Sequence, residues 1–202
     1  MSYPAKIIQM AGSARSINAS FMPVTLDEKT YNADIYALNY AILLFSRNLA
    51  KIDISISQIF TQFSRSFLLN LLNTPVEDIK KIANHSLLMF RLEKSNNSML
   101  NYFFNTASIE VRNIKSKQKL QLFLLREAAR NDISTAQLIS GLSVDELILL
   151  ANQSNDEITK TLLDNHHIYV YRGTESALKQ SLIMPESNNA QMISFTKLLL
   201  GK

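Results

Sequence analysis

The sequence predicts a mainly α-helical protein, and three observations carry that prediction. The 202 residues include only four Gly and four Pro, so long stretches run without a residue that breaks a helix. From Asn32 onward, apolar residues recur at spacings of three and four, the period of a helix with one buried face. Hydrophobic residues make up 47% of the chain, which is enough to build a folded core.

The first helix is expected to begin near Asn32, which we interpret as its N-cap. Its apolar seam consists of Ile35, Leu38, Ile42, Phe45, Leu49 and Ile52. Such a seam packs either against the chain's own core or against another helix in a dimer, and both interpretations stay open. Residues 1–31 lack a clear period and hold two of the four Pro, so they are expected to form an N-terminal arm.

Comparing the chain with itself indicates a tandem duplication. At one constant offset, matched pairs include Arg47 and Arg126, Asp53 and Asp132, Ser64 and Ser143, and Leu68 and Leu147. After a short insertion, NHSLLMFR (84–91) falls on NHHIYVYR (165–172). We therefore expect an arm at 1–31, a first unit at 32–111 and a second unit at 112–202.

Each unit is expected to contain about four helices and to end in a short strand. Helix caps are predicted at Asp53, Asp132, Ser64 and Ser143, and capping boxes at TPVE (74–77), SVDE (143–146) and SNDE (154–157). Asn84 and Asn165 are expected to end their helices in the left-handed conformation. The segments that follow, SLLMFR and HIYVYR, are rich in strand formers and predict the closing strands.

The residues that carry most enzyme chemistry are missing from recognisable patterns. There is no Gly-rich phosphate loop, nucleophile elbow or paired-carboxylate pattern, so we do not expect an enzyme. The absence of Cys excludes disulfides and thiolate zinc sites. His166 and His167 point to opposite faces of an extended segment, so a capping or structural role for His85 and His166 is favoured over metal binding. No metal or cofactor is expected.

Hydropathy and the N-terminal sequence predict a cytoplasmic protein. The longest apolar runs fall far short of the roughly 20 residues that cross a bilayer. The first residues make a poor secretory signal because their hydrophobic run is too short. No membrane association is therefore expected.

Charge points to an anionic partner such as nucleic acid. The formal net charge is +4, and the segment RNIKSKQK (112–119) places Arg112, Lys115, Lys117 and Lys119 close together in sequence. Such side chains can contact phosphates and release counterions from DNA. The alternative is an ordinary solvated face, which stays open.

Residues 134–151 resemble a helix-turn-helix, with Gly141 in the turn. The second helix of this pair begins with Asp145 and Glu146, which repel phosphate. The corresponding helix of the first unit suits a DNA groove better, because its early polar residues are Ser64, Arg65, Ser66 and Asn70. If either unit touches DNA through this helix, we expect the first.

Residues 34–53, DIYALNYAILLFSRNLAKID, and 68–93, LLNLLNTPVEDIKKIANHSLLMFRLE, are similar to the FlhD family of bacterial flagellar transcriptional activators. The resemblance runs from Asp34 to Glu93 with few gaps, and residues 118–172 resemble the family more faintly. It implies a helical DNA-binding regulator that dimerises through its first helix, here through Ile35, Leu38, Ile42, Phe45 and Leu49. It also implies a zinc-bearing FlhC-like partner at promoter DNA, and related pairs control transfer genes on mobile elements.

Two departures from the family bear on architecture. Family members are about half this length, so the two units are expected to form a single-chain pseudo-dimer, with a homo-oligomer as the alternative. The family's cysteine is replaced by Leu or Met, so an intersubunit disulfide is impossible. A second function stays open, a helical adaptor or anti-activator without intrinsic DNA binding. The acidic second helix favours this alternative, whereas the basic junction favours the activator.

Overall fold

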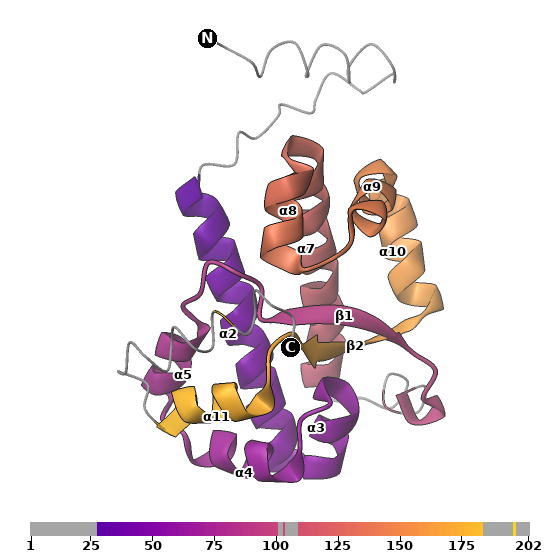
Figure 1. Ribbon diagram of the computed structural model, residues 1–202. Coiled ribbons are helices and arrows are strands. Elements are labelled where there is room, and N and C mark those ends of the chain that lie inside the picture. Colours follow the sequence, from indigo (N-terminus) through magenta and orange to yellow (C-terminus); the bar gives the residue numbers. More distant parts are fainter. Residues whose placement is uncertain (1–27, 101–102, 104–108, 184–195, 197–202) are drawn as a thin grey trace, which may run out of the picture. The chain divides into compact units, whose positions relative to one another are not determined.

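The computed structural model is mainly helical and contains a single described sheet of two strands (Figure 1). It describes residues 28–100, 103, 109–183 and 196, apart from the side chains of 28–31 and 109–112. The chain divides after Tyr31, and Asn32–Lys202 forms one compact unit. None of the described helices is by itself long and apolar enough to cross a membrane.

The described elements fall into two series, which we call the first and second halves, followed by one more helix. The first half contains α2 (Glu28–Ile52), α3 (Ile54–Thr61), α4 (Arg65–Asn73), α5 (Val76–Ala83) and β1 (Phe90–Ser95). The second half contains α7 (Ile109–Asn131), α8 (Ile133–Ser140), α9 (Val144–Asn152), α10 (Asn155–Asp164) and β2 (His166–Tyr171). The additional helix is α11 (Glu175–Ile183).

The element boundaries recur at the spacing found in the sequence. Helices α3, α4 and α5 begin at positions 54, 65 and 76, and α8, α9 and α10 begin at positions 133, 144 and 155, so the offset is the same in each case. Each half thus has four described helices before its strand, as expected. The unit boundary expected at 111–112 falls inside the continuous helix α7, and the division into two units stays a prediction.

Local caps explain where several of these helices begin. The side chain of Asp53 accepts a hydrogen bond from the Ser55 amide at 2.7 Å, which starts α3. The equivalent contact at α8 joins Asp132 to the Ser134 amide at 2.9 Å. The two predicted capping boxes that begin at Ser143 and Ser154 are both present. These starts were predictable because each one depends on residues within one turn.

Two predicted helix starts are wrong. Helix α2 begins at Glu28, so Asn32 lies inside the helix and is not its N-cap. TPVE is not a capping box, because the N-cap of α5 is Pro75, which makes no side-chain cap bond. Thr74 instead ends α4, where its hydroxyl donates to the Asn70 carbonyl at 2.9 Å.

Left-handed residues end α3 and α8 rather than α5 and α10. Asn84 and Asn165 do occupy C-cap positions, but their φ angles of −77° and −130° are not left-handed. The left-handed caps are Gln62, with φ 58°, and Gly141, with φ 69°. The turn of each helix pair therefore contains the left-handed residue.

Strands β1 and β2 pair antiparallel and join the two halves (Figure 1). Their register runs from Phe90 opposite Tyr171 to Ser95 opposite His166. Strand β2 lies where it was predicted, but β1 begins at Phe90 rather than at residue 86. The backbone just before Phe90 does not continue the strand pairing. Its Leu88 amide donates to the Ile139 carbonyl of α8 at 3.1 Å instead.

The apolar seam of α2 lies in the core of the chain itself. Exposure is 0% for Ile35 and Ile42, 1% for Leu38, 2% for Leu49 and 9% for Phe45, whereas Ile52 is 62% exposed. Residues from the second half and from α11 belong to the same core, including Ile114, Ile168, Tyr169, Leu178 and Leu182. A separate partner could reach the five buried side chains only if the chain opened, so an intermolecular interface there stays a prediction.

Two buried amide side chains tie the long helices to the strands and the loop before β1. Asn39 of α2 is fully buried, donates to the Leu87 carbonyl at 2.9 Å and accepts from the Met89 amide at 2.8 Å. Its counterpart in the second half, Gln118 of α7, is also buried and donates to the His167 carbonyl at 2.8 Å. Each amide satisfies backbone groups that would otherwise be buried without a partner.

Replacing Asn39 with Ala is expected to lower the free energy of unfolding by about 2–4 kcal/mol. The substitution leaves the Met89 amide and the Leu87 carbonyl buried without their hydrogen-bond partner. Urea unfolding followed by circular dichroism measures the change. Asn48→Ala is the matched control, because Asn48 lies on the same helix but is exposed. Equal effects of the two substitutions would contradict the role of Asn39.

Candidate nucleic-acid and partner interface

Two helix pairs have the form of a helix-turn-helix. Helices α8 and α9 are joined by residues 141–143 and bend by 113° relative to each other. That angle lies within the range of about 90–120° that is typical of the motif. Helices α3 and α4 are joined by an equally short turn, residues 62–64. The helix-turn-helix predicted at 134–151 therefore has suitable geometry.

The N-terminus of α4, which was expected to face DNA, is occupied by a carboxylate of the same chain. The Ser64 amide donates to Oε2 of Glu175 at 2.7 Å, and the Ser64 hydroxyl donates to Oε1. Ser64 also accepts from the Phe67 amide at 3.2 Å, as an N-cap does. Because its amide and hydroxyl are both engaged, Ser64 is a structural cap here and not an open phosphate ligand.

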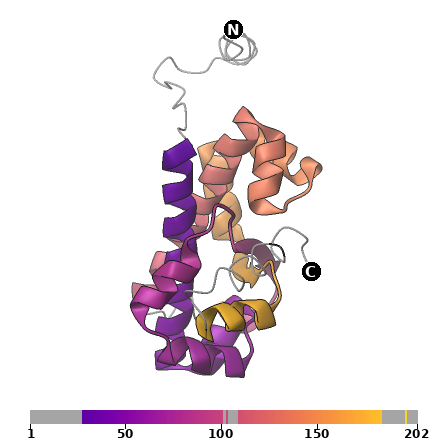
Figure 2. The same ribbon diagram turned by 60° about the vertical axis from the view of Figure 1, so that its left-hand side comes forward.

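The equivalent cap in the second half uses a local carboxylate instead. There, the Ser143 amide donates to Oε2 of Glu146 at 2.8 Å, within the same turn. At the corresponding position of α4 stands Phe67, which is fully buried. Since an apolar residue fills this position, Glu175 of α11 supplies the carboxylate from far along the chain. Helix α11 lies across α4 and α5 (Figure 2).

The remaining α4 candidates differ in how far they reach solvent. Arg65 and Ser66 are exposed at the start of the helix, and Asn70 is half-buried one turn later. The hydroxyls of Ser66 and Ser64 lie 3.0 Å apart. Arg65 is therefore the accessible cation that α4 offers to a phosphate.

Helix α9 presents an apolar and acidic surface. Val144 and Ile148 are each 42% exposed and Leu149 is 68% exposed, beside the exposed carboxylates of Asp145 and Glu146. Exposed aliphatic side chains of this size are typical of contacts with proteins. Acidic side chains disfavour DNA phosphates, as the sequence indicated.

The basic residues of segment 112–119 do not form one patch. Residues two positions apart lie on opposite sides of a helix, so Lys117 is exposed on a different side from Lys115 and Lys119, which are half-buried. The ammonium of Lys119 lies 5.3 Å from the centre of the Phe123 ring. The side chain of Arg112 lies outside the described residues. Because the segment is helical, close spacing in sequence does not place Lys115 and Lys117 on one face, and contact of these residues with DNA stays a prediction.

The histidines do not form a metal site in the described residues. No group of three His, Cys, Asp or Glu side chains there could hold a metal ion. Burial lowers the pKa of His85, His166 and His167. The imidazoles are therefore largely neutral near pH 7.

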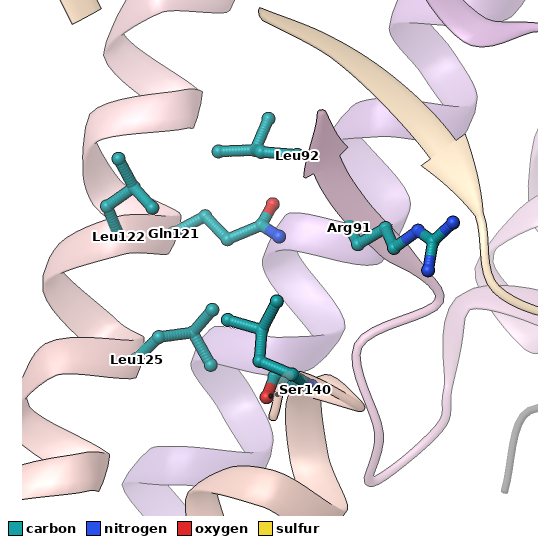
Figure 3. Close-up of a pocket in the computed structure, with 7 residues that line it drawn as sticks. Arg91, Leu92, Gln121, Leu122, Leu125 and Ser140 are labelled. Carbon is teal, nitrogen blue, oxygen red and sulfur yellow. Dashed lines mark hydrogen bonds between the residues drawn. The ribbon is translucent and has the colours of Figure 1, made fainter. Parts of the chain in front are cut away.

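A small cavity of about 30 Å³ lies between β1, α7 and the end of α8 (Figure 3). Gln121 points into it, donates through Nε2 to the Phe90 carbonyl at 2.9 Å and leaves its Oε1 buried without a partner among the described residues. Arg91, Leu92 and Ser140 are among the other lining residues (Figure 3). This volume is about that of one water molecule, so the cavity suits a structural water rather than a substrate.

Arg172 and Glu175 are the contacts that sequence reasoning missed. The Arg172 guanidinium donates to the Leu88 carbonyl at 2.7 Å and also to the Ile139 carbonyl. Burial lowers the pKa of Arg172 to about 10, so it stays charged at neutral pH. Arg172 ends the repeated segment NHHIYVYR, but no local pattern predicts the contacts of either residue, because their partners lie far away in sequence.

Replacing Glu175 with Ala is expected to lower the free energy of unfolding by about 1–2 kcal/mol, because two hydrogen bonds at the start of α4 lose their acceptor. Chemical denaturation gives the value. Glu77→Ala serves as the control, because that carboxylate is highly exposed and pairs only with Lys80 of the same helix among the described ion pairs. If Glu175→Ala has no larger effect than the control, the long-range cap does not contribute.

In comparisons with protein-family models, curated proteins and solved structures, none matches this chain.

Proposed function

We propose that this chain is a DNA-binding subunit of a transcriptional activator, built from two FlhD-like units in tandem. It acts with an FlhC-like zinc-bearing partner at the promoters of flagellar or mobile-element transfer genes. The observation that carries the proposal is a helix-turn-helix arrangement that recurs in both halves at the constant offset, with 113° between the helices of the second pair. Such a motif commonly presents its second helix to DNA.

A shared contact in the two halves supports the duplication. Arg47 of α2 donates to the Leu72 carbonyl at 3.2 Å, near the end of α4. Its counterpart Arg126 of α7 donates to the Gln153 carbonyl at 3.3 Å, at the end of α9. In both halves, an arginine of the long helix thus binds a carbonyl that the end of a short helix leaves unpaired.

The single-chain pseudo-dimer is supported by what covers the seam of α2. Family members are expected to dimerise through this helix, whereas here Ile42, Phe45 and Leu49 of the seam share one hydrophobic cluster with residues of the second half, Ile114 of α7 and Tyr169 of β2. The antiparallel pairing of β1 with β2 also joins the two halves. One chain would therefore supply both subunits of the family dimer.

The two short helices are proposed to have different tasks. Arg65 at the exposed start of α4 contacts DNA phosphate, and the apolar face of α9 with Ile148 and Leu149 contacts the partner protein.

An alternative function is an adaptor or anti-activator without DNA binding. It is favoured by the acidic residues of α9 and by Glu175, which closes the N-terminus of α4.

Light scattering during size exclusion tests the architecture. The pseudo-dimer is expected to elute without a partner as a monomer of 22.9 kDa, because its dimer surface is covered within the chain. A stable dimer or tetramer under the same conditions would contradict it.

A mobility-shift series with DNA from the gene's own neighbourhood tests the function, with and without an FlhC-like partner and at two salt concentrations. Arg65→Gln is expected to weaken binding several-fold and to reduce the salt slope by about one, because one phosphate contact is lost. Lys160→Gln on exposed α10 is the control of equal charge change. If no DNA binding is seen in any combination, the activator proposal is contradicted and the adaptor or anti-activator is favoured.

A further inference from the structure

Basic side chains from three elements meet at one end of the two-stranded sheet. Lys94 of β1 stands opposite His167 of β2, and His166 directly precedes His167 on that strand. The side chain of Gln118 donates to the His167 carbonyl at 2.8 Å, which places α7 against the same end. Lys115 lies one turn before Gln118 on the same side of α7. We call Lys94, Lys115, His166 and His167 the strand-end cluster.

The charges that act on the two imidazoles within the cluster are positive. After burial, which is the largest cause, the charge of Lys115 lowers the pKa of His166. Burial also lowers the pKa of His167 first, and the charges of Lys94 and Lys115 lower it further. A backbone hydrogen bond with Asn165 acts in the opposite direction on His167.

Two carboxylates lie near the cluster in the described part of the chain, Glu93 and Asp164. Glu93 of β1 forms an ion pair with Arg91 on the same strand. Asp164, at the end of α10, is exposed and does not contribute to the pKa of either histidine. Lys94 and Lys115 carry charges of the same sign as the protonated imidazoles, and an added anion would relieve this repulsion.

One atom of the cluster is also left without a hydrogen bond. Nδ1 of His167 is buried and has no partner among the described residues. A buried polar atom of this kind costs free energy until it is paired. If His167 is protonated, both ring nitrogens donate, and Nδ1 can then bind an anionic oxygen.

We propose that the strand-end cluster binds a phosphate group. Lys94 and Lys115 supply positive charge, and His167 supplies a donor that forms when the ring takes up a proton. The phosphate can belong to a DNA backbone or to a small free anion. Only the DNA source rests on the proposed function, and the site itself does not.

Anion binding at this cluster should depend on pH in a defined direction. In the free protein the pKa of each histidine lies below 6.5, so both rings are mostly neutral above that pH. A bound dianion stabilises the imidazolium, so binding takes up a proton and weakens as pH rises through the histidine pKa of the complex. The two lysines also attract the anion, so some affinity persists at higher pH.

Sulfate is the suitable first probe because it stays a dianion over this range, whereas phosphate changes charge. Calorimetric titration of the full chain with sulfate, against chloride of equal ionic strength, is expected to give tighter binding at about pH 5.5 than at about pH 8. Lys94→Gln is expected to weaken sulfate binding about fivefold or more, because a charge-assisted contact is lost. His167→Gln should reduce the dependence on pH.

Lys117→Gln is the matched control, since Lys117 is exposed on another side of α7 and carries the same charge. Lys94 and Lys117 are both exposed, so circular dichroism should show both variants folded. No sulfate-specific binding at either pH, or an equal loss in Lys94→Gln and Lys117→Gln, would overturn the proposal.

The same variants in the mobility-shift series distinguish the two sources. If Lys94→Gln weakens both sulfate and DNA binding, the cluster holds a DNA phosphate. If it weakens sulfate binding alone, the cluster is a small-anion site, and the activator proposal is unaffected. If sulfate binds while DNA does not bind in any combination, the cluster stands and the activator proposal fails.

Discussion

The pairing of β1 with β2 is the constraint on which the rest of the fold depends. A two-stranded ribbon is marginal in water by itself, so these strands need cover on their faces. Phe90 and Tyr169 provide it as fully buried side chains, one from each strand. Gln118 and Gln121 of α7 donate to the carbonyls of His167 and Phe90 and thereby hold both strands. Because each strand comes from a different half, the ribbon and its cover require both halves.

Arg172 also joins the two halves, beside the end of the two-stranded sheet where Phe90 pairs with Tyr171. Its guanidinium binds the carbonyls of Leu88, before β1, and of Ile139, in α8. A Cβ at Gly141 would stand 2.6 Å from Nη2 of Arg172, and φ there is 69°. Glycine is therefore favoured at this position, because a larger residue would have to adopt the left-handed conformation and displace the Arg172 side chain. The equivalent cap, Gln62, has nearly the same φ of 58° and carries a side chain.

Sequence reasoning succeeded where one turn of chain decides the structure and failed where distant contacts decide it. The caps at Asp53, Asp132 and Ser143 follow from neighbouring residues, so they were predictable. The start of β1 was not, because the Leu88 amide is bound by Ile139 of the second half. The carboxylate of Glu175 at Ser64 was also out of reach, since no local spacing links positions so far apart in the chain.

The two short helices show why equal scaffolds need not carry equal tasks. Both N-termini already hold a carboxylate, Glu175 at α4 and Glu146 at α9, and that negative charge disfavours a phosphate at the same place. In the proposed function, phosphate contacts must therefore come from side chains such as Arg65 or from the strand-end cluster. Helix α9, with Leu149 68% exposed, then has a surface suited to protein contact. Under the proposed function, the first half would contact DNA and the second half would contact the partner protein.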